Sequence, residues 1–167
     1  MRRYTDKPFP PYKHLPGQTA HPERNPDGYR FGKTAASVRA LGENEWHRNM
    51  DYLYGVDLFN AGYYWEAHAV WEELWRAAPA SSRSSRFLQG LIQLAACSLK
   101  RTAGEEAGAA KLLQSALDKL ERVSGDSPRY MGIELPELLS KAIGSNDRIE
   151  IELEFPVSGR VLYSRNT

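Results

Sequence analysis

The chain has 167 residues, 41% of them hydrophobic and 26% charged, which is ordinary for one globular domain with a single sizeable core. A formal net charge of +1 gives no electrostatic reason to expect a nucleic-acid partner, and the single cysteine, Cys97, excludes an internal disulfide and a cysteine-clustered metal site. No apolar run approaches the ~20 residues of a membrane span and no signal peptide is evident, so we expect a cytoplasmic protein without a membrane partner.

The first 40 residues predict an extended arm. Prolines and aromatic rings alternate there, at Pro8, Pro10, Pro11, Pro16, Pro22 and Pro26, and at Tyr4, Phe9, Tyr12, Tyr29 and Phe31. Prolines prevent a regular helix, while rings can anchor an extended chain on a surface. We therefore divide the chain into a proline-rich arm, residues 1–40, that wraps the body, and a helical domain, residues 41–167. The arm carries His14 and His21, which could complete a metal site or be bystanders.

Residues 44–60 predict the first helix. Its apolar face is formed by Trp46, Met50, Leu53 and Tyr54. Asp57 projects from the middle of that face, and it needs a partner because an unpaired buried charge is very costly. The partner could be backbone amides at the start of the next helix, or Asp57 could be a metal ligand or a base. Asn60 is expected to be a cap or turn residue beside Gly62.

The next helix completes a hairpin that ends near Ala78. One broad arc at ~100° per residue holds Tyr64, Ala67, Val70, Trp71, Leu74 and Trp75. Glu66 and Glu73 fall opposite this arc, which predicts that they face solvent. His68 and Glu72 lie one turn apart on the flank between the two faces. They form either a functional pair or a charge ladder with Arg76 worth only ~0.2–0.5 kcal/mol per pair.

The helix predicted at residues 85–102 follows a linker and supplies a third wall. Its apolar residues cover more than half of its circumference, so this helix should be largely buried. The narrow polar stripe contains Arg86, Gln89, Gln93, Cys97 and Lys100. This stripe either faces solvent or lines a pocket. For a pocket, we expect Gln89 or Gln93 on the wall opposite Asp57, His68 and Glu72.

The remaining elements close the bundle. Helical spacing predicts a fourth helix at residues 105–123 and a shorter one at 135–142. Apolar residues then alternate with glutamates from Ile149 to Phe155, which predicts a short C-terminal extended strand. A lone strand needs a partner, either the arm or the same segment of a second subunit. The fold class is therefore an all-α, compact helical bundle, and we expect a homo-oligomer, most simply a dimer.

Two segments resemble a known family. DLFNAGYYWEAHAVWEELWRAAP and FLQGLIQLAACSLK are similar to the hallmark segments of the domain of unknown function 309 family, and PPYKHLPGQTAHP resembles the lead of its longer members. The resemblance implies a compact all-helical domain and a predicted metal-dependent hydrolase. It places Glu66, His68 and Glu72 in the Glu-Ala-His-Glu-Val-Trp-Glu motif. Ala69 departs from that motif, which typically has an acid after the histidine, so either the acid is dispensable or the hydrolase description does not apply.

Two functions follow as alternatives. The first is a metal-dependent hydrolase in which Asp57, His68 and Glu72 hold a divalent cation that activates water, with a small-molecule substrate of unknown identity. The second is a non-enzymatic interaction module. Small and large residues from Gly55 to Pro79 fit one tetratricopeptide-like helical hairpin, although the ~34-residue period does not recur downstream.

Overall fold

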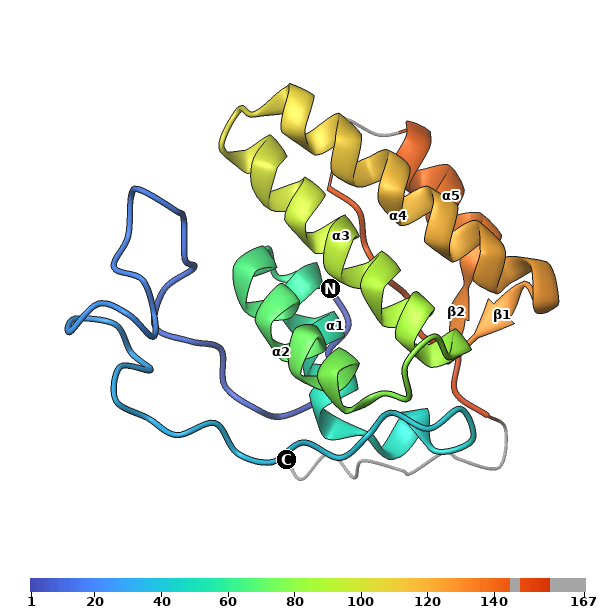
Figure 1. Ribbon diagram of the computed structural model, residues 1–167, viewed down its shortest axis with the longest axis horizontal. Helices are drawn as coiled ribbons and strands as arrows, with labels where there is room; N and C mark the ends of the chain where they lie inside the picture. Colours follow the sequence, from blue (N-terminus) through green and yellow to red (C-terminus); the bar gives the residue numbers. More distant parts are fainter. Residues whose placement is uncertain (145–147, 157–167) are drawn as a thin grey trace.

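The computed structural model describes residues 1–144 and 148–156. Five α-helices dominate this part of the chain, and the predicted all-α fold is confirmed (Figure 1). They are α1 (Met50–Asn60), α2 (Tyr64–Ala77), α3 (Arg83–Thr102), α4 (Glu106–Asp126) and α5 (Leu135–Gly144). Residues 1–45 form no helix or strand.

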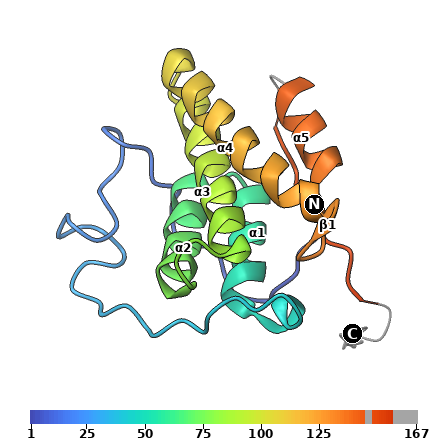
Figure 2. The same ribbon diagram turned by 45° about the vertical axis from the view of Figure 1, so that its right-hand side comes forward.

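The helices pack mainly on their neighbours along the chain. The α1–α2 hairpin lies on α3, α3 lies along α4, and α5 covers the other side of α4 (Figures 1 and 2). The α3–α4 contact is close at Gly90, where a Cβ atom would come within 2.6 Å of the Leu120 side chain. Any larger residue at this position would force the two helices apart.

The first helix is shorter than the sequence predicts. A 3-10 turn, η1 (Trp46–Arg48), precedes α1, and Asn49 separates the two with an extended backbone. The side-chain oxygen of Asn49 accepts a hydrogen bond from the backbone N–H of Tyr52 at 3.0 Å. This N-cap satisfies a donor that the helix leaves free, so α1 begins at Met50 instead of near Asn44.

Trp71 is the central residue of the hairpin core. Its side chain is fully buried, and its indole N–H points at the backbone oxygen of Tyr52 at 3.4 Å. The ring lies directly against Gly55 of α1, where a Cβ atom would be 2.1 Å from the indole nitrogen. Gly55 therefore lets α1 and α2 approach closely enough to enclose Trp71.

A two-stranded hairpin that the sequence pattern did not predict connects α4 to α5. β1 (Arg129–Tyr130) pairs antiparallel with β2 (Ile133–Glu134), and Tyr130 lies opposite Ile133. The turn between the strands has positive φ angles at Met131 and Gly132 (45° and 80°), as a tight hairpin turn requires. Each strand is only two residues long, too short for periodicity to reveal it.

The C-terminal segment, residues 148–156, alternates in burial as predicted, with Ile149, Ile151 and Leu153 inside. It forms no strand ladder among the described residues, although the N–H of Glu154 donates to the backbone oxygen of Gly132 in the β1–β2 turn at 2.8 Å. Side chains supply further hydrogen bonds. The Asn60 amide donates to the oxygen of Ile151 and accepts from its N–H, both at 2.8 Å. The Tyr4 hydroxyl accepts from the N–H of Leu153 at 2.9 Å. The residue after Asn60, Ala61, caps α1, and the Asn60 side chain instead takes the place of a partner strand for the C-terminal segment.

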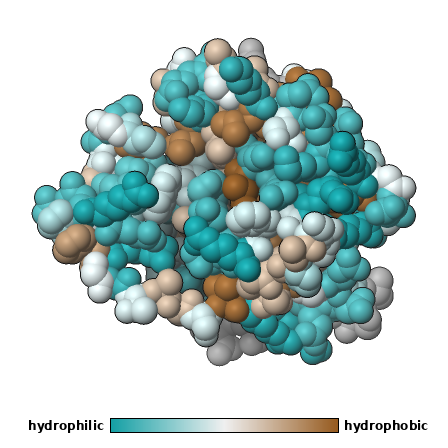
Figure 3. All heavy atoms as spheres, viewed as in Figure 1, coloured by the Kyte–Doolittle hydropathy of each residue, from teal (hydrophilic) through white to brown (hydrophobic). Residues whose placement is uncertain are grey.

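The surface is mostly polar. Figure 3 shows one face that is largely hydrophilic, with small separate hydrophobic spots. The large apolar side chains that are exposed in the described ranges are Met1, Phe31, Met50 and Ile143. Within the same ranges, no helix combines the length and apolar character needed to cross a membrane.

Candidate functional site: the Glu66 cavity

Asp57 anchors the N-terminal arm. Its side chain is fully buried, as expected from its place on the apolar face of α1. The carboxylate accepts hydrogen bonds from the N–H of Tyr4 (2.7 Å) and from the N–H and hydroxyl of Thr5 (2.9 and 2.7 Å). Arg3 forms an ion pair with it, Nε to Oδ2, at 3.2 Å. The amides that satisfy Asp57 thus come from the arm and not from the start of α2.

His68 and Glu72 lie one turn apart on α2, away from the partners of Asp57. Glu72 is about one third exposed and forms an ion pair with Arg76 at 3.2 Å, which is the charge ladder considered above. Burial lowers the pKa of His68, and Glu72 partly opposes this shift. The neutral imidazole, which is the form that binds metal ions, is therefore favoured.

Gln89 and Gln93 are half-buried on α3. The side-chain oxygen of Gln93 is buried without a hydrogen-bond partner. Across residues 1–144 and 148–156, no group of three or more His, Cys, Asp or Glu side chains is arranged to hold a metal ion. A metal at Asp57 would have to displace three hydrogen bonds and an ion pair.

Glu66 is the buried acid of α2, and the prediction that it faces solvent is wrong. Only 4% of its surface is exposed. Its Oε1 accepts a hydrogen bond from the backbone N–H of His14 at 2.7 Å and a longer one from the Tyr29 hydroxyl at 3.4 Å. Its Oε2 is buried and has no hydrogen-bond partner in the part of the chain that the structure describes. The arm therefore covers the flank of α2 that helical periodicity assigns to solvent.

A cavity of about 290 Å³ lies beside Glu66, between the hairpin and the arm. We call it the Glu66 cavity. It is lined by Asp51, Tyr54 and Leu58 of α1, by Trp65, Glu66, Ala69, Val70 and Glu73 of α2, and by Lys7, Pro10, Tyr29, Arg30, Ala35, Ala36 and Val38 of the arm. His68 comes two residues after Glu66, so it points ~200° around the helix and lies outside the cavity.

The arm histidines pack at one side of Glu66. The rings of His14 and His21 each meet Trp65 edge-on, with centroids 5.1 and 5.2 Å away. The two imidazoles lie 5.1 Å from each other, and the Nδ1 atom of His14 is 2.8 Å from the Thr19 hydroxyl. Both rings thus fold over α2 against Trp65, and the other partner of His14 is the Thr19 hydroxyl.

The electrostatics of the cavity follow from its burial. Desolvation raises the pKa of Glu66, and the His14 N–H bond opposes this shift. Desolvation also raises the pKa of Tyr29, with a further contribution from the neighbouring Glu66 carboxylate. A carboxyl with a raised pKa and an unpartnered oxygen is typical of a site that binds a ligand or exchanges a proton.

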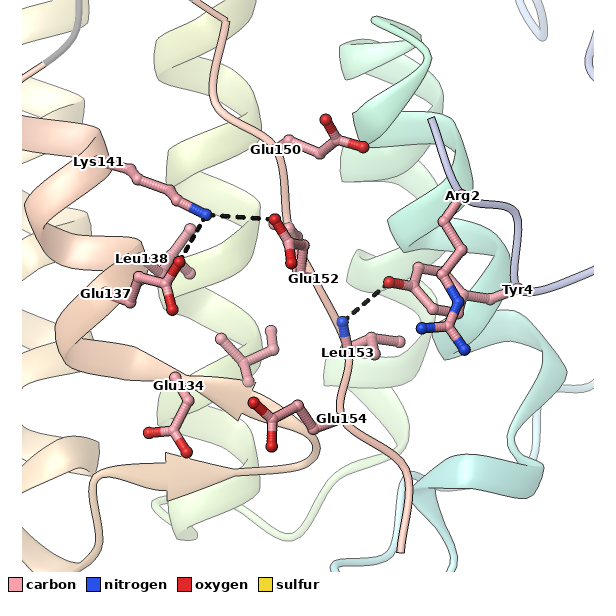
Figure 4. A pocket seen from close by; sticks show the side chains of 12 residues that line it. Arg2, Tyr4, Glu134, Glu137, Leu138, Lys141, Glu150, Glu152, Leu153 and Glu154 are labelled. Atoms are coloured by element: carbon pink, nitrogen blue, oxygen red, sulfur yellow. Dashed lines mark hydrogen bonds and ion pairs between the residues drawn. The ribbon is translucent and has the colours of Figure 1, made fainter. Parts of the chain in front are cut away.

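A second cavity, of about 240 Å³, lies between α5, the C-terminal segment and the start of the arm (Figure 4). It is rich in glutamates: Glu134, Glu137, Glu150, Glu152 and Glu154. Most of these charges are already paired. Lys141 binds Glu137 and Glu152 at 2.8 and 3.5 Å, while Arg129 binds Glu134 and Glu154. These ion pairs join α5 and β1 to the C-terminal segment. The paired glutamates therefore hold these elements together.

Sequence reasoning identified the hairpin but not this cavity. The sequence placed Glu66 in a motif and on a solvent face, because its partners His14 and Tyr29 lie 52 and 37 residues away in the chain. The alanine at position 69, where the motif typically has an acid, was a signal in the sequence that could have indicated the cavity. Ala69 lines the Glu66 cavity, so an acid at this position would stand one turn from Glu66 on the same wall.

Comparison with known protein families confirms the resemblance. Residues 52–112, a little over a third of the chain, match the family described as domain of unknown function (DUF309). The match runs from Tyr52 in α1 to Leu112 in α4, a range that contains Asp57, Glu66, His68 and Glu72. No curated protein matches the chain. The family description specifies no activity, so the function has to be argued from the site.

Proposed function

We propose that this protein is a small-molecule-binding protein whose ligand occupies the Glu66 cavity. The observation that supports this proposal is the carboxyl of Glu66, which lines the cavity and whose buried Oε2 atom has no hydrogen-bond partner within the described ranges. Leaving a buried polar group unpaired costs about 1–3 kcal/mol, and a ligand that donates a hydrogen bond would recover this energy. The cavity lies at the small end of ligand pockets, so the ligand is small.

The arrangement of the walls also favours binding. Two walls come from the rigid helical hairpin, whereas the third comes from the arm, which Asp57 holds in place. Sites between a fixed scaffold and a covering segment bury most of a ligand's surface. This proposal agrees with the binding module inferred from the sequence, but it assigns the binding to a cavity and not to the hairpin surface.

A thermal-shift screen of a diverse fragment library tests the proposal. A ligand at 100 times its Kd stabilises a protein by about 2.7 kcal/mol, which is readily detected. Hits should stabilise the wild type and the control Glu121→Gln, an exposed acid of α4, but not Glu66→Gln. Ala69→Leu, which fills the cavity, should abolish binding too. If no fragment binds, or if hits bind all four proteins equally, the proposal is wrong.

A metal-dependent hydrolase at His68 and Glu72 is the second candidate. Its support is the lowered pKa of His68, which leaves a nitrogen free to coordinate a metal, and the carboxylate of Glu72 one turn away. Asp57, Gln89 and Gln93 are the further ligands expected from the sequence, and Asp57 would have to leave its partners in the arm to take part. Metal analysis of protein purified without an affinity tag tests it. Stoichiometric metal that is lost in His68→Ala supports the hydrolase, and metal-free protein that Mn²⁺, Zn²⁺ and Mg²⁺ fail to stabilise argues against it.

The dimer predicted from the sequence is also a proposal. The sequence suggested a dimer because the C-terminal segment and the arm needed partners. Both find partners within the same chain, since Asn60 binds Ile151 and Tyr4 of the arm binds Leu153. A dimer would therefore use the remaining edge of the C-terminal segment or a helix surface. Light scattering at tens of micromolar measures the mass directly, and a monomeric mass would refute the proposal.

A further inference from the structure

We infer that the Glu66 cavity takes a small organic cation, namely an amine attached to an apolar or aromatic body. This inference rests on the proposed function and specifies the class of ligand. Three features of the cavity support it: the unpartnered oxygen of the Glu66 carboxyl, the aromatic side chains around the cavity, and the balance of charge along its walls.

The Glu66 carboxyl lines the cavity and has one oxygen without a partner among the described residues. His14 and Tyr29 hold Oε1 at 2.7 and 3.4 Å, and Oε2 has no partner although the side chain is 96% buried, being only 4% exposed. A ligand that reaches this oxygen in the ionised carboxylate has to donate a hydrogen bond. An ammonium group does so with a charge, and such a bond is roughly twice as strong as one between neutral groups.

Aromatic side chains form a second part of the cavity that suits a cation. Tyr29, Tyr54 and Trp65 all line it. The ammonium of Lys7 lies 4.4 Å from the centre of the Tyr54 ring, so one primary amine already occupies a ring face at the rim. Lys7 is exposed and has no ion-pair partner in the described part of the chain. Its flexible side chain can turn into water and leave this face to a ligand.

The side chains that line the cavity without an ion pair include one more acid than base, so one positive charge on a ligand would balance them. Arg30 is paired with Glu23 at 3.3 Å, and Glu73 is paired with Arg76 at 2.6 Å. Two acids, Asp51 and Glu66, and one base, Lys7, then line the cavity without an ion pair within residues 1–144 and 148–156. A monovalent cation would balance the excess acid, whereas an anion would add to it.

The apolar walls of the cavity favour an organic cation over an inorganic metal ion as the ligand. Leu58 and Val70 of the hairpin and Val38 of the arm face the same space as Glu66. A hydrated inorganic cation would gain nothing from these side chains, but an organic cation buries its carbon atoms there. The combination of one acid, several rings and an apolar wall therefore fits an arylalkylamine.

Isothermal titration calorimetry with three isosteric probes tests the inference. The probes are phenethylamine, 2-phenylethanol and 3-phenylpropionate, which carry a positive charge, no charge and a negative charge. We expect only phenethylamine to bind the wild type and Glu121→Gln, and Glu66→Gln to weaken it at least roughly tenfold. Its affinity should also rise from pH 5 to pH 7, because a deprotonated Glu66 binds the cation better.

The outcomes separate this inference from the proposed function. If the alcohol or the carboxylate binds as well as the amine, the cation inference is wrong while small-molecule binding stands. If phenethylamine, tyramine and benzylamine all fail although the fragment screen finds ligands that depend on Glu66, the inference is wrong as well. Should Glu66→Gln not fold, as judged by circular dichroism, Ala69→Leu takes its place, and amine binding that survives in Ala69→Leu overturns the inference.

Discussion

Replacing Asp57 with alanine tests whether this carboxylate holds the N-terminal arm on the helices. The fully buried side chain accepts three hydrogen bonds from Tyr4 and Thr5, at 2.7, 2.9 and 2.7 Å, and pairs with Arg3 at 3.2 Å. Asp57→Ala removes all of these contacts together. The freed donors then either stay buried without partners or leave the surface with the arm.

The expected loss can be bounded from these contacts. A hydrogen bond to a charged group contributes about 1.5–3 kcal/mol, so three of them set an upper limit of about 5–9 kcal/mol. Detachment of residues 3–5 lets water satisfy the donors, which limits the loss. We expect Asp57→Ala to cost about 3–5 kcal/mol, the range seen when one partner of a buried ion pair is removed. Thr5→Val removes only one hydroxyl and should cost about 1 kcal/mol.

Urea unfolding followed by tryptophan fluorescence measures this loss. Trypsin provides a second readout, because release of the arm exposes the bond after Arg3 to cleavage. Asp118→Ala, at an exposed acid of α4, is the matched control and should change the free energy of unfolding by less than about 0.5 kcal/mol.

The anchoring role of Asp57 is refuted if Asp57→Ala unfolds within about 1 kcal/mol of the wild type and is cut no faster. A chelator separates anchoring from metal binding. If EDTA lowers the stability of the wild type to that of Asp57→Ala, the carboxylate holds a metal and not the arm.

Three further predictions concern the core, the C-terminal segment and the pH dependence. Trp71→Ala should lower the free energy of unfolding by about 3–5 kcal/mol, and a melting temperature within a few degrees of the wild type would contradict the packing against Gly55. Asn60→Ala should cost about 2–4 kcal/mol and abolish hydrogen-exchange protection at the Ile151 amide; retained protection would show that another group bonds this segment. Because burial raises the pKa of Glu66 above 4.5, its stabilising contribution is complete below pH 4.5 and is lost as the pH rises through the folded-state pKa. The melting temperature of Glu66→Gln relative to the wild type should therefore increase from pH 4 to pH 7, and a difference that is constant with pH would exclude the raised pKa.

Local sequence periodicity was sufficient to predict the helices. The apolar spacing that places Trp71 and Leu74 on one face of α2 acts within a few turns, so it can be read without knowledge of distant residues. The same spacing correctly put Asp57 on an apolar face in need of a partner. It also predicted the alternating burial from Ile149 to Leu153. It could not show that a side chain, Asn60, would satisfy the backbone of that segment.

Tertiary structure decided which polar residues are buried. Glu66 lies on the polar side of α2, and helical periodicity assigned it to solvent because periodicity describes one helix at a time. The arm, some 40–50 residues earlier in the chain, covers that side and converts Glu66 into a buried acid beside a cavity. Contacts between segments so far apart depend on how the whole chain packs, since no local pattern specifies which surface an extended arm will cover.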